Sequence, residues 1–524
     1  MAIGEKSEPK ARLIVVRLTI VALRYHTGAF KFDDTPMPGE RGEAMDARAM
    51  FGDVEFPPGD RKRWLALAEK ALAGASFDEA LVSHTDDGIR IEPLYERVAT
   101  DEFLPRRNPR APWTIVQRID DPDPKRANAQ ALEDIEQGAT GIALVFEGAP
   151  NAFGYGLPGT AEALETVLDD ILLSRTYVRI DVHQASRAMA DWLVNILTRR
   201  RADPSKLHLS FGIDPAATFA GTGRLRMSIE ALQASMPQSL AHFFALGVPG
   251  VLLEADGRVL HNAGATEAQE LGVMLASAVA HLRLFEEARQ ALVYAAPHIG
   301  FCLSVDQDQF LSMAKIRALR KLWARVQQAC SVSPSSATIH AETSYRMMTV
   351  RDPETNILRS TLAGFAAVAG GADSLSILPH TIAHGLPDAF ARRIARNTQL
   401  IMSDESHLDF VSDPASGSGG VEALTAALCD AAWKEFQAIE AEGGILRSLS
   451  QGHIQKRVAE ARNARVVEYR SGKRVLVGTT VYPVKSERPV KVLEADRRPA
   501  PSDGVVFCEP LPATRIDELI GAAE

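Results

Sequence analysis

The sequence predicts an α/β protein whose main domain is a (β/α)8 barrel of the TIM type, with an N-terminal helical arm and a C-terminal extension. Eight short apolar runs follow one another between residues 141 and 411, and a stretch of helical periodicity separates each run from the next. Parallel strands need a crossover helix between them, so this rhythm is typical of a parallel sheet. A further amphipathic segment at 421–440 can close the ring. A doubly wound open sheet is the competing topology.

The expected elements share simple patterns. The expected strands are apolar runs bounded by polar or glycine residues: 141–147, 176–182, 207–213, 250–254, 299–305, 337–341, 373–377 and 408–411. The expected helices have apolar residues at helical spacing: 161–173, 188–199, 269–286, 309–328, 358–369 and 389–402.

The chain divides into four segments by composition. Residues 1–55 are rich in glycine, proline and acidic residues and predict a flexible extension. Residues 56–120 predict an N-terminal arm or linker that contains an amphipathic helix at 61–74. Residues 121–442 predict the barrel, and residues 443–524 predict a C-terminal helix followed by an extended tail.

The C-terminal segment changes character along its length. A charged helix is expected at 454–465 and a strand at 474–482. A proline-rich stretch from Pro483 to the end then predicts an extended tail, suited to lying on another surface.

Composition and charge exclude several classes of protein. The formal net charge of −9 argues against a nucleic-acid surface, which needs clustered positive charge. The apolar segment 13–23 is interrupted by Arg17 and is too short to cross a bilayer. Four cysteines without a pairing pattern indicate a reducing compartment. We expect a cytoplasmic protein with neither a nucleic-acid nor a membrane partner.

A glycine-rich stretch suggests a dinucleotide site but does not meet its requirements. Gly154, Gly156 and Gly159 form a GxGxxG pattern between an expected strand and an expected helix. A dinucleotide fingerprint turns tightly at the strand end, whereas six residues separate Glu147 from Gly154 here. We interpret the stretch as a glycine-rich barrel loop.

Two histidine-containing patterns also fall short of a cofactor or metal site. Asp181 and His183 begin a DxHxxG-like pattern of cobalamin-binding modules, but Ser186 stands where the glycine belongs. We interpret Asp181 and His183 as a hydrogen-bonding pair at a strand end. His380 and His384 lack the glutamate of a zinc motif, so no metal site is expected.

Acidic residues are frequent where the expected strands end. In a (β/α)8 barrel the active site lies at the carboxyl ends of the strands, although acids there also cap the helices that follow. The candidates at this rim are Glu147, Asp181, Asp214, Glu254, Asp256, Asp306, Glu342, Asp373 and Asp413.

Several stretches resemble one enzyme family. The matching stretches are 389–417, which contains Arg-Asn-Thr-Gln-Leu, and 421–425, 352–374, 112–117, 89–97 and 263–266. They resemble the methylmalonyl-CoA mutase family over about residues 56–510. The resemblance implies a barrel that encloses the acyl and pantetheine parts of a CoA ester and is topped by a cobalamin domain.

The departures from the family pattern fall on its catalytic positions. The family's Gly-Tyr-His-Met-Gln-Glu-Ala-Gly run corresponds to 257–264, so Arg258 replaces the tyrosine and Val259 replaces the histidine that would hydrogen-bond the thioester carbonyl. Asn108 replaces an active-site tyrosine, and Asp373 replaces a glutamine. Losing one such donor typically costs about 10²–10³ in rate, so no catalytic residue is expected on this chain.

The resemblance is strongest to the small, or beta, subunit of heterodimeric methylmalonyl-CoA mutase. It implies a large catalytic subunit as partner and adenosylcobalamin bound by that partner. No cofactor is expected on this chain, because no cobalamin-binding Rossmann-like domain is recognisable after Tyr482. Two alternatives stay open: an active acyl-CoA mutase barrel working with a separate cobalamin-binding protein, and a CoA-ester-binding regulatory protein.

Basic and polar residues near the expected barrel mouth are candidates for contact with acyl-CoA. The arginines before Trp113 would meet CoA phosphates under the CoA-binding alternative, although a solvated basic loop is the preferred explanation for them. The candidates are Arg106, Arg107, Arg110, His261, His340, Glu342 and Ser374.

Overall fold

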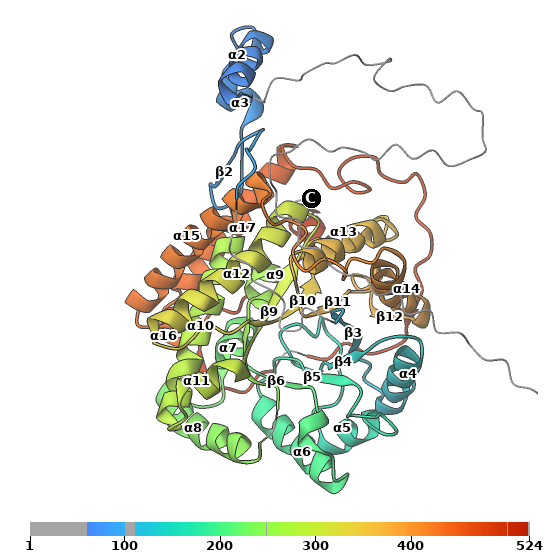
Figure 1. The fold of residues 1–524 in the computed structure, drawn as a ribbon. Coiled ribbons are helices and arrows are strands. Elements are labelled where there is room, and N and C mark those ends of the chain that lie inside the picture. Colours follow the sequence, from blue (N-terminus) through green and yellow to red (C-terminus); the bar gives the residue numbers. More distant parts are fainter. Residues whose placement is uncertain (1–59, 100–110, 248, 500, 522–524) are drawn as a thin grey trace, which may run out of the picture. The chain divides into compact units, whose positions relative to one another are not determined.

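The computed structural model describes residues 60–99, 111–247, 249–499 and 501–521. The chain forms two compact units, Met1–Ala71 and Leu72–Glu524, which are treated separately. In the first unit, the described residues are Asp60 and residues 61–71 of helix α2 (Arg61–Leu72), which agrees with the helix expected at 61–74. The second unit contains everything that follows (Figure 1).

Eight parallel strands close into a barrel in the second unit, so the predicted (β/α)8 fold is confirmed. Closure occurs where β11 pairs in parallel with β3, with Leu375 opposite Ile115. The barrel strands, in chain order, are β3 (Thr114–Ile119), β4 (Gly141–Leu144), β5 (Tyr177–Ile180), β6 (Leu209–Ile213), β8 (Val251–Asp256), β9 (Ile299–Val305), β10 (Thr338–Thr343) and β11 (Ser374–Ser376).

Seven of the eight expected strands coincide with barrel strands, but the expected strand at 408–411 is wrong. Those residues lie in a turn and bend after a π-helix, Ile401–Glu405, and Phe410 is 75% exposed. The true first strand is β3, which lies inside the segment 56–120 expected as an arm. The expected strand at 474–482 is also wrong, since only an isolated bridge joins Val477 and Val481 there.

Helices alternate with the strands and cover the outside of the barrel. Seven begin with a side-chain cap at Asp, Ser or Thr, as at Thr266, whose capping box starts α10. The helices around the barrel are α4 (Pro124–Glu136), α5 (Ala161–Val167), α6 (Ser186–Arg199), α7 (Pro215–Thr222), α8 (Ile229–Ala245), α9 (Arg258–Ala263), α10 (Glu267–Glu287), α11 (Leu292–Ala295), α12 (Gln309–Ala329), α13 (Thr355–Ala369) and α14 (Ala389–Leu400).

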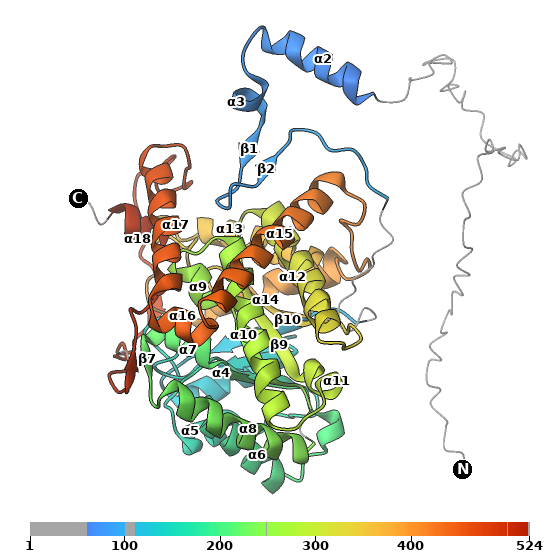
Figure 2. The ribbon, with the colours of Figure 1, turned by 90° about the vertical axis from the view of Figure 1, so that its left-hand side faces the viewer.

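Further helices lie outside this ring. Figure 2 shows α15 (Gly419–Ala441) lying along α10 and α12. Across the described ranges, no helix is both long and apolar enough to cross a bilayer. The remaining elements are α3 (Phe77–Leu81), β1 (Ser83–His84), β2 (Arg90–Ile91), α16 (Ile445–Ser450), α17 (His453–Arg470) and α18 (Ile516–Gly521).

The core has two different layers. Between strands and helices the side chains are apolar, as for Ile142 and Leu144 on β4. Inside the barrel many side chains are polar or charged. For example, Arg118 of β3 and Arg179 of β5 both lie opposite Ala143 of β4, the strand between them. Because residues of β3 face this polar interior, the sequence of β3 is not a continuous apolar run.

Residues 477–499 and 501–516 lie along the barrel at the carboxyl ends of the strands, and we call them the C-terminal belt. Two short strands attach it to barrel loops. β13 (Val492–Leu493) pairs with β12 (Leu386–Pro387), which follows β11. β14 (Val506–Phe507) pairs with β7 (Arg224–Leu225), which follows β6.

Backbone hydrogen bonds hold the belt between and beyond these strands. The N–H of Arg498 donates to the carbonyl of Gly154 at 2.8 Å, and that of Thr514 donates to the carbonyl of Asn262 at 2.9 Å. The belt therefore contacts the loops after β11, β4, β6 and β8. The expected extended tail lies on the chain's own barrel.

Candidate functional site

Arg258 occupies the mouth of the barrel. It starts α9 directly after β8, and its side chain is 1% exposed. The guanidinium donates to Asp256 at 2.6 Å and to Glu342 at 3.1 Å, and it also contacts Asp181. Three carboxylates from three strand ends therefore converge on Arg258.

Two further arginines extend this arrangement into the barrel. Arg179 donates to Glu254 at 2.7 Å and to Asp181 at 3.2 Å. Arg118 lies 3.7 Å from Glu342. We call these seven side chains the mouth ion network: Arg118, Arg179, Asp181, Glu254, Asp256, Arg258 and Glu342. Their side chains are nearly or wholly shielded from water.

The network fixes the charge of Arg258 and of Asp181. Burial alone would lower the pKa of Arg258, but the surrounding carboxylates raise it well above its usual range. Burial alone would raise the pKa of Asp181, but Arg258 and Arg179 outweigh it and hold that pKa well below 3.8. Burial raises the pKa of Glu342 despite Arg258. Arg258 is thus a permanent cation whose N–H groups are directed at carboxylates.

Val259 points into apolar packing. It is 2% exposed and belongs to a cluster that contains Val182, Phe219 and Ala220. An isopropyl group has no proton to donate, and its neighbours here supply none. Val259 therefore contributes to the apolar core.

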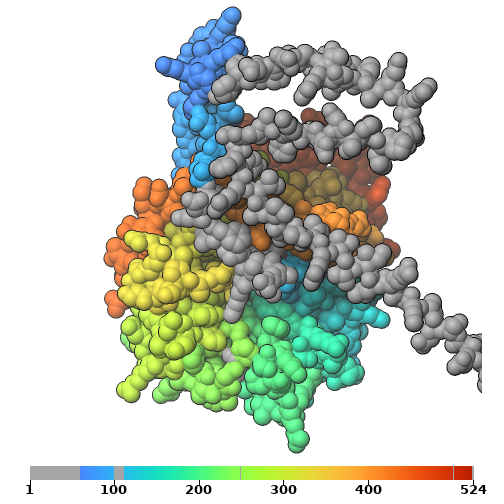
Figure 3. All heavy atoms as spheres, in the orientation of Figure 1, coloured from blue at the N-terminus to red at the C-terminus, as the bar shows by residue number. Residues whose placement is uncertain are grey.

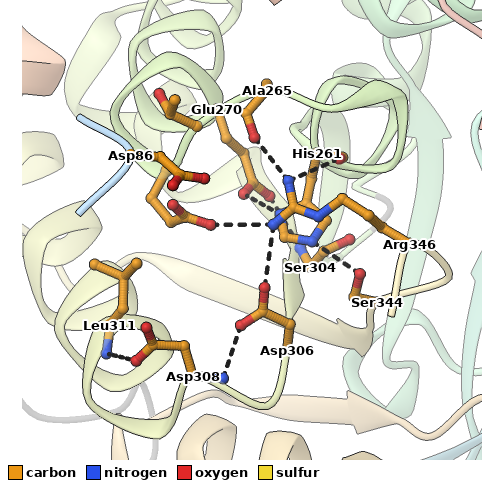
Figure 4. A network of polar contacts seen from close by, with 12 residues as sticks. Asp86, His261, Ala265, Glu270, Ser304, Asp306, Asp308, Leu311, Ser344 and Arg346 are labelled. Atoms are coloured by element: carbon orange, nitrogen blue, oxygen red, sulfur yellow. Dashed lines mark hydrogen bonds and ion pairs between the residues drawn. The ribbon is translucent and has the colours of Figure 1, made fainter. Parts of the chain in front are cut away.

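His261 is internal and has both ring nitrogens occupied. Its Nδ1 lies 3.2 Å from a carboxylate oxygen of Glu270, and its Nε2 lies 2.9 Å from the hydroxyl of Ser344. Figure 4 shows this ring beside Arg346 and Glu270. Burial lowers the pKa of His261 well below 6.5, so the ring is neutral. The structure does not place His261 where it could contact acyl-CoA at the barrel mouth.

Arg346 organises the neighbouring polar cluster. Its guanidinium donates to the carbonyl of Ala265 at 2.8 Å, to Asp306 at 3.1 Å and to Glu267 at 3.3 Å (Figure 4). These bonds tie the loop after β10 to the start of α10. The cluster is a structural brace beside the mouth ion network.

His340 and Ser374 lie inside the barrel on neighbouring strands. The Nδ1 of His340 lies 2.8 Å from the Ser374 hydroxyl, and its Nε2 has no hydrogen-bond partner among the described residues. Burial lowers the pKa of His340 well below 6.5, and Arg179 and Arg258 lower it further. The structure therefore brings Arg258, His340, Glu342 and Ser374 together.

Two acids expected at the carboxyl rim lie elsewhere. Asp373 precedes β11 at the amino end of the barrel, where its carboxylate accepts from the N–H of Ile339 at 2.8 Å and from Arg320 at 3.0 Å. Asp413 pairs with Arg317 at 2.9 Å in a loop, because no strand precedes it. Both placements at the rim are wrong. Arg106, Arg107, Asn108 and Arg110 lie outside the described residues.

A cavity of about 730 Å³ opens at the amino end of the barrel. The first residues of several strands line it, including Thr114, Tyr177 and Thr338. Exposed Arg175 and His208 also line it. The sequence analysis missed this cavity because it searched only the carboxyl ends of the strands.

Arg118 and Arg179 were also missed by the sequence analysis. Each stands two residues from an acid, Asp120 or Asp181, in or beside a short apolar strand. In a strand that is buried on both faces, a charged residue must meet an opposite charge inside the barrel. This pattern could have revealed the mouth ion network.

The residues of the DxHxxG-like pattern do not fit a corrin ligand. His183 Nε2 lies 2.9 Å from the carbonyl of Glu147, and its Nδ1 accepts from the N–H of Ala185 at 2.9 Å. Both nitrogens hold the loop together, so neither is available to cobalt. Over the described part of the chain, no three His, Cys, Asp or Glu side chains are arranged to hold a metal ion.

Comparison with known proteins gives one family. The family model for methylmalonyl-CoA mutase matches residues 105–503. A methylmalonyl-CoA mutase small subunit from Streptomyces virginiae is 36% identical over 471 residues, covering 86% of this chain and 74% of the relative. The small subunit from Propionibacterium freudenreichii subsp. shermanii is 34% identical, covering 85% and 72%. A methylmalonyl-CoA mutase from Escherichia coli K12 is 28% identical, covering 88% and 70%. The chain belongs to the methylmalonyl-CoA mutase family.

Proposed function

We propose that this chain is the non-catalytic small subunit of a cytoplasmic, adenosylcobalamin-dependent methylmalonyl-CoA mutase, and that it supports a catalytic large subunit. One observation carries the proposal. Arg258, at the position of the family's tyrosine, is buried among Asp181, Asp256 and Glu342 at the barrel mouth. The names of the small-subunit relatives support the same assignment.

The side chains at the barrel mouth explain why this chain would not catalyse the rearrangement by itself. A thioester carbonyl needs a proton donor within hydrogen-bond reach when charge develops on its oxygen. Arg258 directs its N–H groups at three carboxylates, and Val259 has none to offer. Entry of a substrate would also separate buried ion pairs, and breaking such a pair costs about 3–5 kcal/mol.

Bound to the large subunit, adenosylcobalamin would supply the radical chemistry of the carbon-skeleton rearrangement. The residues of this chain would keep the barrel closed and rigid. The mouth ion network excludes water from the barrel, and the C-terminal belt holds four of its loops together.

A reconstitution assay tests the proposal. We would measure succinyl-CoA formation from methylmalonyl-CoA, with adenosylcobalamin, for the chain alone and for the chain mixed with the large subunit. We expect turnover only in the mixture, and unchanged kcat when His340→Gln replaces the wild-type chain there. Turnover by the chain alone would contradict the proposal. Turnover with a free-standing cobalamin-binding protein in place of the large subunit would favour the active split-mutase alternative.

Binding of a CoA ester is a second candidate function, and the cavity at the amino end favours it. A cavity of about 730 Å³ is within the range that holds a small ligand. Arg175 and His208 line it and could meet the negative charges of CoA.

Equilibrium titration with acyl-CoA tests this second function. We expect Arg175→Ala with His208→Ala to weaken binding about tenfold, because two polar contacts are lost. Arg199→Ala is the matched control, since Arg199 is exposed on α6 and pairs only with exposed Glu165. No measurable binding of acyl-CoA to the wild-type chain would exclude the function.

A further inference from the structure

A cavity of about 130 Å³ lies among the helices on the outside of the barrel. It is lined by the starts of α7 and α8, by one face of α10, and by the turn from α15 into α16. Figure 1 and Figure 2 show α8, α10 and α16 on the same side of the barrel, and Figure 3 shows green-to-yellow and orange atoms at the surface of that side. Since a cavity of about 150 Å³ can hold one benzene molecule, this cavity can hold one small organic molecule.

The walls of this cavity are apolar, and its rim is charged. The charged residues that line it are all exposed, and one of them, Arg283, pairs with Glu440. Exposed charges are screened by water and salt, so they select only weakly for a charged ligand. Apolar walls with few polar groups are typical of pockets that bind small molecules. The apolar wall residues are Ile229, Leu232, Ala280, Leu284, Ile445 and Leu446.

His281 of α10 is a buried polar side chain in the wall, with an exposed fraction of 2%. Its Nε2 lies 3.0 Å from the backbone carbonyl oxygen of Glu254. A carbonyl oxygen can only accept, so Nε2 carries the ring proton and Nδ1 has a free lone pair. Burial lowers the pKa of His281 to about 4, so near pH 7 the ring stays neutral and Nδ1 stays an acceptor.

The Nδ1 atom of His281 has no hydrogen-bond partner among the described residues. The other buried polar side chain in the wall, Ser277, is already engaged. Its hydroxyl donates to Asp214 at 3.0 Å and lies 3.3 Å from Nε2 of His281. Buried polar atoms are nearly always paired with protein, water or a ligand. The unpaired nitrogen therefore favours a bound molecule that brings its own donor.

We propose that this cavity binds a small, uncharged hydroxyl compound of about the size of phenol. Its hydroxyl donates to Nδ1 of His281, and its apolar body contacts the wall residues Leu232, Ala280 and Ile445. A molecule without a donor leaves Nδ1 unpaired, and a charged molecule loses its hydration against the apolar wall. The site uses no side chain of the mouth ion network, so the inference does not depend on the proposed function.

Titrations of the full-length wild-type chain with phenol and with toluene test the proposal. The two molecules have nearly the same size, but only phenol has a donor. At pH 7 we expect phenol to bind about tenfold more tightly than toluene, measured by calorimetry or by ligand-observed NMR. Crystals of the chain soaked in phenol then locate the ligand. We expect the phenol oxygen within about 3 Å of Nδ1 of His281.

The variant Ala280→Leu fills the cavity from its wall and leaves His281 in place. We expect the affinity for phenol to fall by at least about tenfold, because the larger side chain occupies the space of the ligand. The matched control is Ala426→Leu, the same substitution at an exposed position of α15 that does not line the cavity. It should change the affinity less than about twofold. The melting temperature of each variant shows whether it is folded.

A preference for phenol over toluene that Ala280→Leu abolishes would support the site. Equal binding of phenol and toluene would overturn the role of His281. No binding of phenol, phenol in the crystals away from His281, or undiminished binding by folded Ala280→Leu would overturn the site itself. If Ala280→Leu does not fold, the wild-type titrations and the soaked crystals still decide between these results. None of the measurements involves mutase activity, so failure here leaves the proposed function standing.

Discussion

The two ends of the barrel have opposite physical characters. At the carboxyl end, Arg258 and its carboxylates fill the mouth with charges that water does not reach. At the amino end, a cavity of about 730 Å³ is lined by the first residues of the strands and by exposed Arg175 and His208. One scaffold therefore combines a closed carboxyl end with an open amino end. The contrast teaches that the two ends of one barrel can be packed in opposite ways without a change of architecture.

Energetics explain why the closed end would persist. A buried ion pair adds little net stability over apolar residues of similar size, but removing one partner leaves an uncompensated charge. Without Arg258, Asp256 would lose its buried cationic partner, and Asp181 and Glu342 would keep only the more distant Arg179 and Arg118. Replacing Arg258 alone by an uncharged residue would therefore destabilise the fold.

The largest effect on stability is expected from removing the charge of Arg258 at the closed carboxyl end of the barrel. Arg258→Met removes the cation but keeps much of its volume, so we expect the free energy of unfolding to fall by about 3–5 kcal/mol. Urea unfolding followed by circular dichroism measures this change. An unchanged unfolding midpoint would mean that the carboxylates do not depend on Arg258.

A compensated variant provides the control for this experiment. Arg258→Met combined with Asp256→Asn and Glu342→Gln removes charge of both signs from the same place. We expect it to recover a large part of the lost stability, because fewer charges remain unpaired. If it is as unstable as Arg258→Met, lost packing rather than lost charge explains the first result.

A smaller effect is expected from His281, which lies directly behind the mouth. It donates to the backbone carbonyl of Glu254 at 3.0 Å, and burial lowers its pKa to about 4 from the usual 6.5. The folded state therefore holds the neutral ring. The stability this contributes is fully present above pH 6.5 and is lost as the pH falls through 4, for a total of about 3 kcal/mol.

The variant His281→Gln tests this pH dependence. Its free energy of unfolding should decline less steeply than that of the wild type between pH 6.5 and pH 4, by about 1.4 kcal/mol per pH unit. If the free energy of unfolding depends on pH in the same way for both proteins, water reaches the region behind the mouth.

The fold could be predicted from the sequence because the strand and helix periods alternate clearly. The prediction failed at β3, where Arg118 faces the polar interior and interrupts the apolar pattern. It also failed at 408–411, where Phe410 and Val411 are apolar but exposed. Periodicity reports which residues are apolar, but not which surface they face.

The site could be predicted only in part. Position 258 could be identified from the family pattern, and Glu342 from its place at a strand end. The convergence of Arg258, Asp181 and Glu342 depends on pairing between strands far apart in the sequence. No local pattern encodes it. His261 was expected near acyl-CoA, but its contacts with Glu270 and Ser344 come from elements that only the fold brings together.

The smallest effect on stability is expected from substitutions in the cavity at the open amino end of the barrel. Arg175→Ala and His208→Ala remove exposed side chains from the cavity lining, so each should change the free energy of unfolding by no more than about 0.5 kcal/mol. Thermal unfolding measures this directly. A loss as large as that of Arg258→Met would erase the contrast between the two ends.

The central claim is that the closed mouth carries no chemistry of its own. The most direct measurement incubates the purified chain, at concentrations comparable to the substrate, with methylmalonyl-CoA and adenosylcobalamin, and counts succinyl-CoA formed per chain. We predict no product above the protein-free background. Product formed by the chain alone, in an amount that rises with its concentration, would contradict the claim.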